Sequence, residues 1–192
     1  MRLLPVLKPN DWPGIDSGVL AHVWEGTTDK PAVVVVYAEV NDDEQVIDYV
    51  TEAEIGASQG DGVVRQAFLN LEHYHTDFEV VEFGSERVLV AAGRQFGAER
   101  ALCQSHMLRA HDKLGAPQIV VSIARRGLLL AAPYECSEEV KQTIVKLHNE
   151  AWSEGASTME QIINELIVFE GGRKVRTIPL PPTGDLPSLL WI

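Results

Sequence analysis

The sequence predicts a single α+β domain in which a mainly antiparallel sheet with hairpins is covered by three or four helices. Short apolar runs bounded by turn-forming residues predict the strands, and amphipathic runs with capping signals predict the helices. Both kinds recur along 192 residues, a length that can bury one substantial core. We expect residues 1–178 to form this domain and residues 179–192 to form a proline-rich arm with an apolar end.

The first predicted strands are residues 18–24 and 32–40, which form an antiparallel pair. Between them, residues 25–31 are turn formers. Val33 to Val36 lack polar alternation, which is typical of a strand buried on both faces. We therefore expect residues 32–40 to be central in the sheet.

A helical region is predicted next. Thr51 and Glu54 have the spacing of a capping box, which indicates a short helical turn. Asp61 can cap a second helix that ends near His73. The buried face of this second helix has helical spacing and comprises Val64, Ala67, Phe68 and Leu71.

The middle of the chain is predicted to contain a hairpin and a helix. Residues 78–83 and 87–91 flank a Gly-Ser turn and predict the hairpin. Residues 98–114 predict the helix, because Gly115 and Pro117 give a clear stop signal after it. Its apolar stripe is Cys103, Met107, Ala110 and Leu114.

A second hairpin and another helix follow. Residues 118–123 and 128–132 flank a turn in which Gly127 can adopt a positive φ. Ser137 is placed to cap a helix that Gly155 should stop. The buried face of that helix comprises Val140, Ile144, Leu147, His148 and Ala151.

Residues 157–175 are ambiguous between a helix and a hairpin. Ser157 and Glu160 have capping-box spacing, and the apolar residues that follow keep helical spacing. However, Gly171 and Gly172 suit a type I′ turn and would each cost about 1 kcal/mol inside a helix. We predict a short helix followed by a hairpin.

Charge and hydropathy exclude several classes of protein. The chain has 16 Lys and Arg against 28 Asp and Glu, a formal charge of −12. That charge disfavours binding to nucleic acid or to an anionic membrane. There is no apolar run of membrane-spanning length and no export signal, so we expect a cytoplasmic protein. The acidity also suits a basic partner.

The order of elements, with residues 67–71, 85–90, 119–130 and 169–174, resembles the YtpQ-like family of bacterial proteins of unknown function. The resemblance covers residues 31–180. In this chain Ala124 stands where the family has Pro, and Gly127 replaces a frequent Asp. The resemblance implies a cytoplasmic α+β protein with the late hairpin, and it supplies no catalytic residues.

No motif for metal binding or for nucleophilic catalysis is present. Cys103 and His106 lie one helical turn apart, but Cys103 belongs to an apolar stripe, and His73 and His75 have no metal-site spacing. Cys136 precedes a helix, yet the neighbouring glutamates disfavour its thiolate. His148 is expected to be a hydrogen-bonded core residue. We therefore expect reduced cysteines, no metal, no cofactor and no catalytic residue.

One loop is a candidate site for an anion. Residues 92–97 join a predicted strand to a predicted helix, and the anion candidates are Arg94, Gly97 and Arg100. The glycine spacing does not match a dinucleotide motif, and Glu99 occupies the first helical turn. A small-ligand or nucleotide-binding enzyme with its site at residues 92–100 is therefore the alternative function.

The leading functional hypothesis is a non-catalytic protein-binding or regulatory domain. Basic residues gather at two predicted hairpin turns, where they form either a solvated edge or a surface for a carboxylate-rich partner. The apolar end of the arm could dock on this chain or on a second copy, so self-association is also open. The candidate partner-binding residues are Arg125, Arg126, Arg173, Lys174, Leu189, Leu190 and Trp191.

Overall fold

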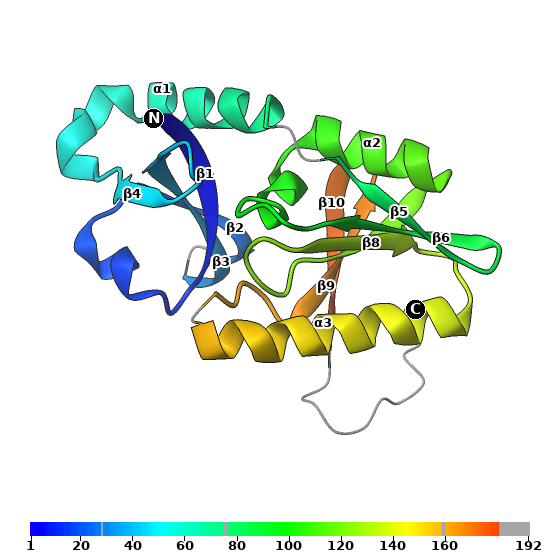
Figure 1. Cartoon of the computed structure of the whole chain (residues 1–192). Helices are drawn as coiled ribbons and strands as arrows, with labels where there is room; N and C mark the ends of the chain where they lie inside the picture. The colour runs from blue at the N-terminus through cyan, green and yellow to red at the C-terminus, as the bar shows by residue number, and fades with distance from the viewer. Residues whose placement is uncertain (28, 75–76, 159, 181–192) are drawn as a thin grey trace. The chain divides into compact units, whose positions relative to one another are not determined.

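A computed structural model describes residues 1–27, 29–74, 77–158 and 160–180 (Figure 1). It confirms an α+β protein with antiparallel sheets and covering helices. The strands divide between two sheets, and each sheet belongs to a compact unit of its own, Met1–His75 and Thr76–Ile192. The sequence assigns residues 1–178 to one domain, and the boundary between the two units, at His75 and Thr76, lies inside that range. No helix among the described residues is long and apolar enough to cross a membrane.

The first unit is built on a four-stranded antiparallel sheet with the long strand β3 at its centre. The order is β1-β3-β2, with β4 also paired to β3. As predicted, Val33 to Val36 are buried and central. The strands are β1 (Arg2–Pro9), β2 (Ala21–Thr27), β3 (Lys30–Val40) and β4 (Val46–Tyr49), and a short 3-10 helix, η1, spans Pro13–Ser17.

Strand β1 was not predicted, because Pro5 and Pro9 interrupt its apolar pattern. The structure accommodates both prolines on a strand that pairs on only one side, with β3. An edge strand tolerates proline because one row of its N–H groups is not needed for the sheet. Leu4, Val6 and Leu7 are nevertheless buried and extend the core of the unit.

One helix, α1 (Glu52–Glu72), replaces the two that the sequence predicts. Its capping box is confirmed, since Thr51 N and Thr51 Oγ1 each donate to Glu54 Oε2, at 2.9 and 2.7 Å. The helix continues through Asp61, which therefore caps nothing. Ala67 and Leu71 are buried as predicted, and Asn70 Nδ2 donates to the carbonyl of Leu3 in β1 at 2.8 Å.

The second unit is a six-stranded antiparallel sheet with a long helix on each face (Figure 1). The strand order is β10-β9-β7-β8-β6-β5. Both predicted hairpins and the late hairpin are confirmed. The elements are β5 (Glu79–Phe83), β6 (Glu86–Ala91), η2 (Ala98–Leu102), α2 (Gln104–Leu114), β7 (Gln118–Ser122), β8 (Leu129–Pro133), α3 (Glu138–Thr158), β9 (Glu165–Glu170) and β10 (Arg173–Pro179).

Alternate residues of the central strands serve the two faces of this sheet. Val120 of β7 and Leu130 of β8 lie in one cluster with Val140 and Ile144 of α3. Their neighbours in sequence point to the opposite face, because successive side chains of a strand alternate. Since both faces are covered, the strands are apolar almost throughout.

The helices of the second unit differ from the prediction in three places. The helix predicted over residues 98–114 is interrupted at Cys103, whose extended backbone (φ −108°, ψ 114°) separates η2 from α2. Helix α3 continues past Gly155 to Thr158. The short helix predicted from Ser157 is absent among the described residues, because the segment before β9 instead pairs with residues after β7: Ile162 N donates to Ala124 O at 2.9 Å.

The C-terminal arm is described only at its beginning. Leu180 is buried with Ile178 in the cluster beneath α3. The apolar residues proposed for partner binding, Leu189, Leu190 and Trp191, lie outside the described residues. The docking of this arm stays a prediction.

Candidate functional site

Two loops of the second unit pack against each other backbone to backbone. Residues 92–97 follow β6, and residues 123–128 join β7 to β8. A Cβ atom on Gly97 would lie 3.0 Å from the carbonyl oxygen of Gly127 and 3.1 Å from that of Ala91. A Cβ on Gly127, whose φ is +74°, would lie 3.2 Å from Arg94 O. Glycine at both positions therefore allows the close approach of the loops.

The paired loops form a recess of about 340 Å³, to which the segment before β9 also contributes. It brings together Arg94 of the predicted anion loop and the predicted basic pair Arg125 and Arg126. The lining contains three arginines and one carboxylate, that of Glu160. The lining residues are Ala92, Gly93, Arg94, Gln95, Arg125, Arg126, Gly127, Leu128 and Glu160.

Arg126 is the most unusual side chain of this recess. Its guanidinium carbon lies 5.0 Å from the ring centroid of buried Phe96, within the range of a cation–π contact. The backbone N–H of Arg126 donates to Glu160 O at 2.9 Å, which fixes the residue in place. However, Nε and Nη2 are both buried and have no hydrogen-bond partner among the described residues. Unpaired buried donors of this kind cost about 1–3 kcal/mol, more for a charged group.

The other two arginines have different surroundings. Arg125 Nε lies 3.4 Å from Glu154 Oε2 of α3, and Arg125 Nη1 donates to the carbonyl of Arg126 at 3.3 Å. Gly155 of α3 leaves room for this arrangement, because a Cβ there would lie 3.0 Å from Arg125 Cβ. Arg94 is exposed. Arg125 is thus paired with Glu154, although its buried Nε makes no hydrogen bond of normal geometry, whereas Arg126 has two buried donors and no ion pair among the described residues.

The other two anion candidates lie outside the recess lining. Gly97 precedes η2, which has only five residues, and its nearest neighbours across the loop are carbonyl oxygens rather than N–H donors. Arg100 is buried, with its guanidinium carbon 4.8 Å from the ring centroid of Phe78. Gly97 therefore serves loop packing, and Arg100 packs inside the unit.

The second predicted basic cluster lies on the edge strand β10. Arg173 is exposed, Lys174 is half-buried, and a register irregularity between Lys174 and Arg176 interrupts the pairing with β9. Arg176 donates to Tyr134 Oη and stacks on that ring. Charges and a bulge on an edge strand oppose edge-to-edge pairing, which agrees with the solvated-edge alternative.

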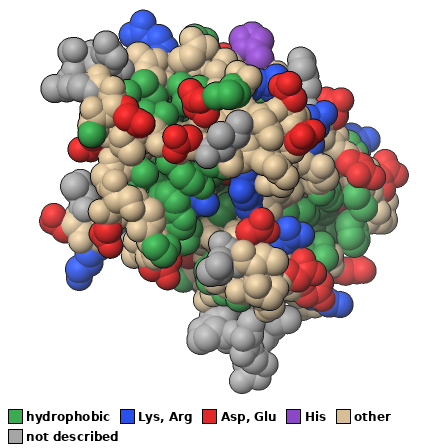
Figure 2. Space-filling model, turned by 60° about the vertical axis from the view of Figure 1, so that its left-hand side comes forward, with side chains coloured by type: hydrophobic (Ala, Val, Ile, Leu, Met, Phe, Trp, Pro, Cys, Tyr) green, Lys and Arg blue, Asp and Glu red, His purple; other side chains and the backbone are tan. Residues whose placement is uncertain are grey.

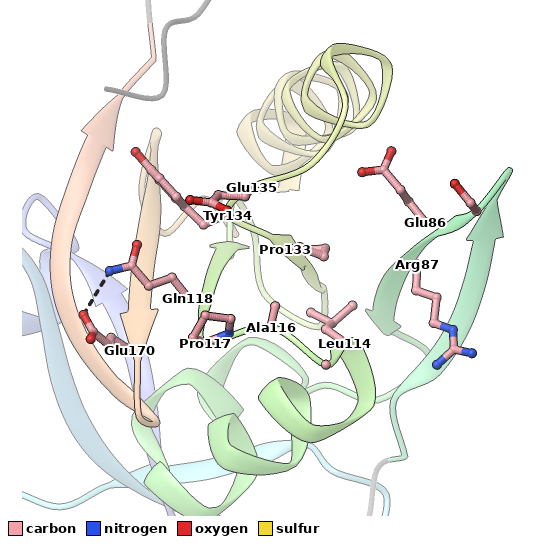
Figure 3. A pocket seen from close by; sticks show the side chains of 12 residues that line it. Glu86, Arg87, Leu114, Ala116, Pro117, Gln118, Pro133, Tyr134, Glu135 and Glu170 are labelled. Atoms are coloured by element: carbon pink, nitrogen blue, oxygen red, sulfur yellow. Dashed lines mark hydrogen bonds between the residues drawn. The ribbon is translucent and has the colours of Figure 1, made fainter.

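A larger pocket of about 750 Å³ lies between the β5–β6 turn and the end of β8 (Figure 3). Figure 3 shows its polar side chains in two groups, with Leu114, Ala116 and Pro117 between them. Two of its three glutamates are already bonded: Glu170 Oε2 accepts from Gln118 Nε2 at 3.0 Å, and Glu86 accepts from Ser137 N at 2.7 Å. Gln118 and Glu170 thus bond each other within the lining, whereas Glu86 is bonded to Ser137, which lies outside it.

The histidine and the two cysteines considered for catalysis or metal binding lie in environments typical of residues that stabilise the fold. His148 is buried and bonds Ser122 through Nδ1 at 2.9 Å, as predicted for a core histidine. Burial raises the pKa of the Cys136 thiol to about 11, and Glu86 adds to this shift. Both Cys103 and Cys136 are free. The described residues contain no cluster of three or more metal-ligating side chains.

The sequence analysis selected the three arginines but did not select Phe96 or Glu160. Phe96 belongs to no motif, and Glu160 is predicted only as part of a capping box, so it is the tertiary packing of the two loops and of the segment before β9 that places them beside Arg126. Surface charge alone would not find the recess either, since carboxylates and basic side chains are interspersed on the face shown in Figure 2.

Comparison with known proteins adds no further assignment. No protein-family model matches the chain. No curated protein and no solved structure matches it significantly. The resemblance to the YtpQ-like family stays a prediction, and the functional argument depends on the geometry of the recess.

Proposed function

We propose that this protein is a non-catalytic binding protein whose second unit holds a carboxylate group of a protein partner at the Arg126 recess. The observation that carries the proposal is the pair of buried, unpaired donors Nε and Nη2 on Arg126. These two donors lie on one edge of the guanidinium plane, which matches the two oxygens of a carboxylate. Both atoms are buried, so binding a partner carboxylate requires that the Arg126 side chain turn toward the open recess.

The surroundings favour a carboxylate over a phosphate. Phosphate sites on glycine loops are built from several backbone N–H groups that point at the anion. Here carbonyl oxygens of Ala91 and Gly127 close the Gly97 side, and Gly97 N already donates to Arg94 O at 3.3 Å. The group proposed to bind the anion is instead the planar guanidinium of Arg126, with its two donors Nε and Nη2. This argues against the alternative of a nucleotide-binding enzyme at residues 92–100.

The lining favours binding over catalysis. Among the described lining residues there is no Ser, Thr, Cys, His, Lys or Tyr to act as nucleophile or proton carrier. The one carboxylate, Glu160, already accepts from Thr158 Oγ1 at 3.3 Å. The two free cysteines suit a reducing compartment such as the cytoplasm. A volume of about 340 Å³ accommodates one side chain or a chain terminus of a partner.

Nuclear magnetic resonance of the arginine Nε–Hε groups tests this proposal. The full chain is titrated with a glutamate-rich hexapeptide and, in parallel, with its glutamine counterpart. The glutamate peptide should shift the Arg126 signal, and Arg126→Gln should weaken its affinity by about tenfold or more, the size expected for a charge-assisted bond. Arg109→Gln is the matched control, because Arg109 is an exposed arginine of α2 outside the recess.

The possible outcomes separate the two functions. Equal affinity of the wild type and Arg126→Gln for the glutamate peptide would refute the proposal. An unshifted Arg126 signal at saturating peptide would refute it as well. Tighter binding of inorganic phosphate or ATP than of the peptide, with the same Arg126 shift, would favour the small-ligand alternative.

A further inference from the structure

A second recess, the first-unit groove, lies between strands β3 and β4 and helix α1 and has a volume of about 410 Å³. It lies wholly within the first unit and shares no residue with the Arg126 recess. Apolar side chains make up most of its lining. The lining residues are Leu3, Glu39, Asp48, Tyr49, Val50, Glu54, Ile55 and Val63.

The apolar part of the groove is incompletely covered by the protein. Leu3, Val50, Ile55 and Val63 are each half-buried, although neighbouring Leu4 and Leu71 are fully buried. When a partner removes half-buried apolar side chains around one concavity from water, binding is favoured by the hydrophobic effect.

Two carboxylates of the groove are neighbours on adjacent strands. Glu39 of β3 and Asp48 of β4 are direct cross-strand partners. Like charges directly opposite each other destabilise a sheet. Glu54 completes the set of acidic residues, and none of the described residues that line the groove is Lys or Arg. A cationic group entering here would relieve this repulsion.

The charge of the unit extends this local pattern. Residues 1–75 contain four Lys and Arg against 13 Asp and Glu, whereas residues 76–192 contain 12 against 15. Most of the net charge of −12 therefore belongs to the first unit. A field of this sign attracts a basic partner and speeds its association.

We propose that the first-unit groove docks a segment of a partner protein in which Lys or Arg side chains alternate with apolar ones. The basic side chains pair with Glu39 and Asp48, and the apolar ones cover Val50, Ile55 and Val63. A bare metal ion fits less well, because Ca²⁺ takes six to eight oxygen ligands and the lining is mostly apolar. Glu54 is also held already by Thr51 N and Oγ1.

Fluorescence anisotropy with a labelled decapeptide of alternating lysine and leucine tests this docking, in about 150 mM salt to screen distant charges. Two double variants of the full chain remove two negative charges each. Glu39→Gln/Asp48→Asn changes the groove, whereas Asp42→Asn/Asp43→Asn changes exposed residues of the β3–β4 turn outside the lining. The first variant should bind the peptide about tenfold more weakly, and the second should bind like the wild type.

A stability measurement excludes a merely structural effect. The two substitutions in the groove keep the side-chain shapes. Asp48 Oδ1 accepts from Tyr49 N at 2.9 Å, and the amide oxygen in the Asp48→Asn variant can accept the same bond. Because the substitutions remove repulsion between cross-strand neighbours, the melting temperature should stay equal or rise while affinity falls. In the wild type, methyl signals of Ile55 and Val63 should shift on addition of the peptide.

Several results would overturn the proposal. Equal weakening of peptide binding by the two double variants would show that only net charge acts. Equal binding of a lysine–serine or a glutamate–leucine peptide would remove the apolar or the basic requirement. Competition by micromolar Ca²⁺ would assign the groove to a metal ion, and unshifted Ile55 and Val63 methyl signals would place the peptide elsewhere.

Discussion

Acidification should destabilise this protein through His148, well before most carboxylates take up protons. The imidazole is buried beneath α3 with Ser122 Oγ on its Nδ1. Neither His148 Nε2 nor Asn164 Oδ1 has a hydrogen-bond partner of normal geometry among the described residues. Burial lowers the pKa of His148 from 6.5 to about 4, and the nearby Asn164 side chain partly opposes this shift. The folded state therefore favours the neutral ring.

The size of the loss in stability follows from the difference between the pKa of His148 in the folded chain and its pKa in the unfolded chain. In the unfolded chain His148 takes up its proton near pH 6.5, whereas in the folded chain it does so near pH 4. Because the unfolded state binds more protons between these values, the free energy of unfolding falls as the pH falls through this window. The loss should be about 2 kcal/mol between pH 7 and pH 5, and about 3 kcal/mol below pH 4.

Urea unfolding at a series of pH values, followed by fluorescence and circular dichroism, measures this loss. His148→Gln removes the titrating group and should flatten the dependence between pH 7 and pH 5. If that variant does not fold, the ring carbon signal of His148 in the wild type gives the same information, since it should remain that of a neutral imidazole at pH 5. A free energy of unfolding that is constant from pH 7 to pH 5, or a ring that is charged at pH 6, would refute the reasoning.

Three further predictions concern single residues. In urea unfolding, Gly172→Ala should destabilise the protein by about 1–3 kcal/mol, and by more than Gly171→Ala does. Both glycines have a positive φ, but only a Cβ on Gly172 would come as close as 2.8 Å to the carbonyl oxygen of Gln104. Thr51→Ala should lower the free energy of unfolding by about 1 kcal/mol through loss of the α1 cap, and no change would show that the cap is dispensable. Cys136 should react slowly with a disulfide reagent at pH 8, because its pKa is raised to about 11 by burial first and by Glu86 second. Glu86→Gln should speed that reaction, and an unchanged rate would remove the electrostatic part of this explanation.

Local chemistry made much of the fold predictable. The capping box at Thr51 and Glu54, and the two positive-φ glycines at residues 171 and 172, act over three or four residues and were recognised. The hairpin strands β5–β10 and the pair β2–β3 were predicted for the same reason, since their apolar runs end at clear turn formers, whereas β1 was not. Element boundaries shifted by only a few residues in these cases.

Features set by neighbours distant in sequence were not predictable in this way. The break at Cys103 lies in a run with good helical spacing. The segment after Thr158 keeps helical spacing as well, but it pairs with residues after β7, and Arg126 N donates to Glu160 O. In the segment after Thr158, tertiary pairing therefore replaces a weak local preference for helix. The division of the strands between two sheets is likewise a property of pairing, which no single run reveals.

The Arg126 recess shows this limit most clearly, because it depends on two glycines of different kinds. Gly127 has a φ of +74°, so its turn alone favours glycine. Gly97 has an ordinary helical backbone (φ −62°), so nothing local calls for glycine there. Glycine is required at position 97 only because a Cβ there would lie too close to the carbonyl oxygens of Gly127 and Ala91. Because that contact brings the loops together, residues selected separately as an anion loop and as a basic turn become one site, with Arg126 beside Phe96.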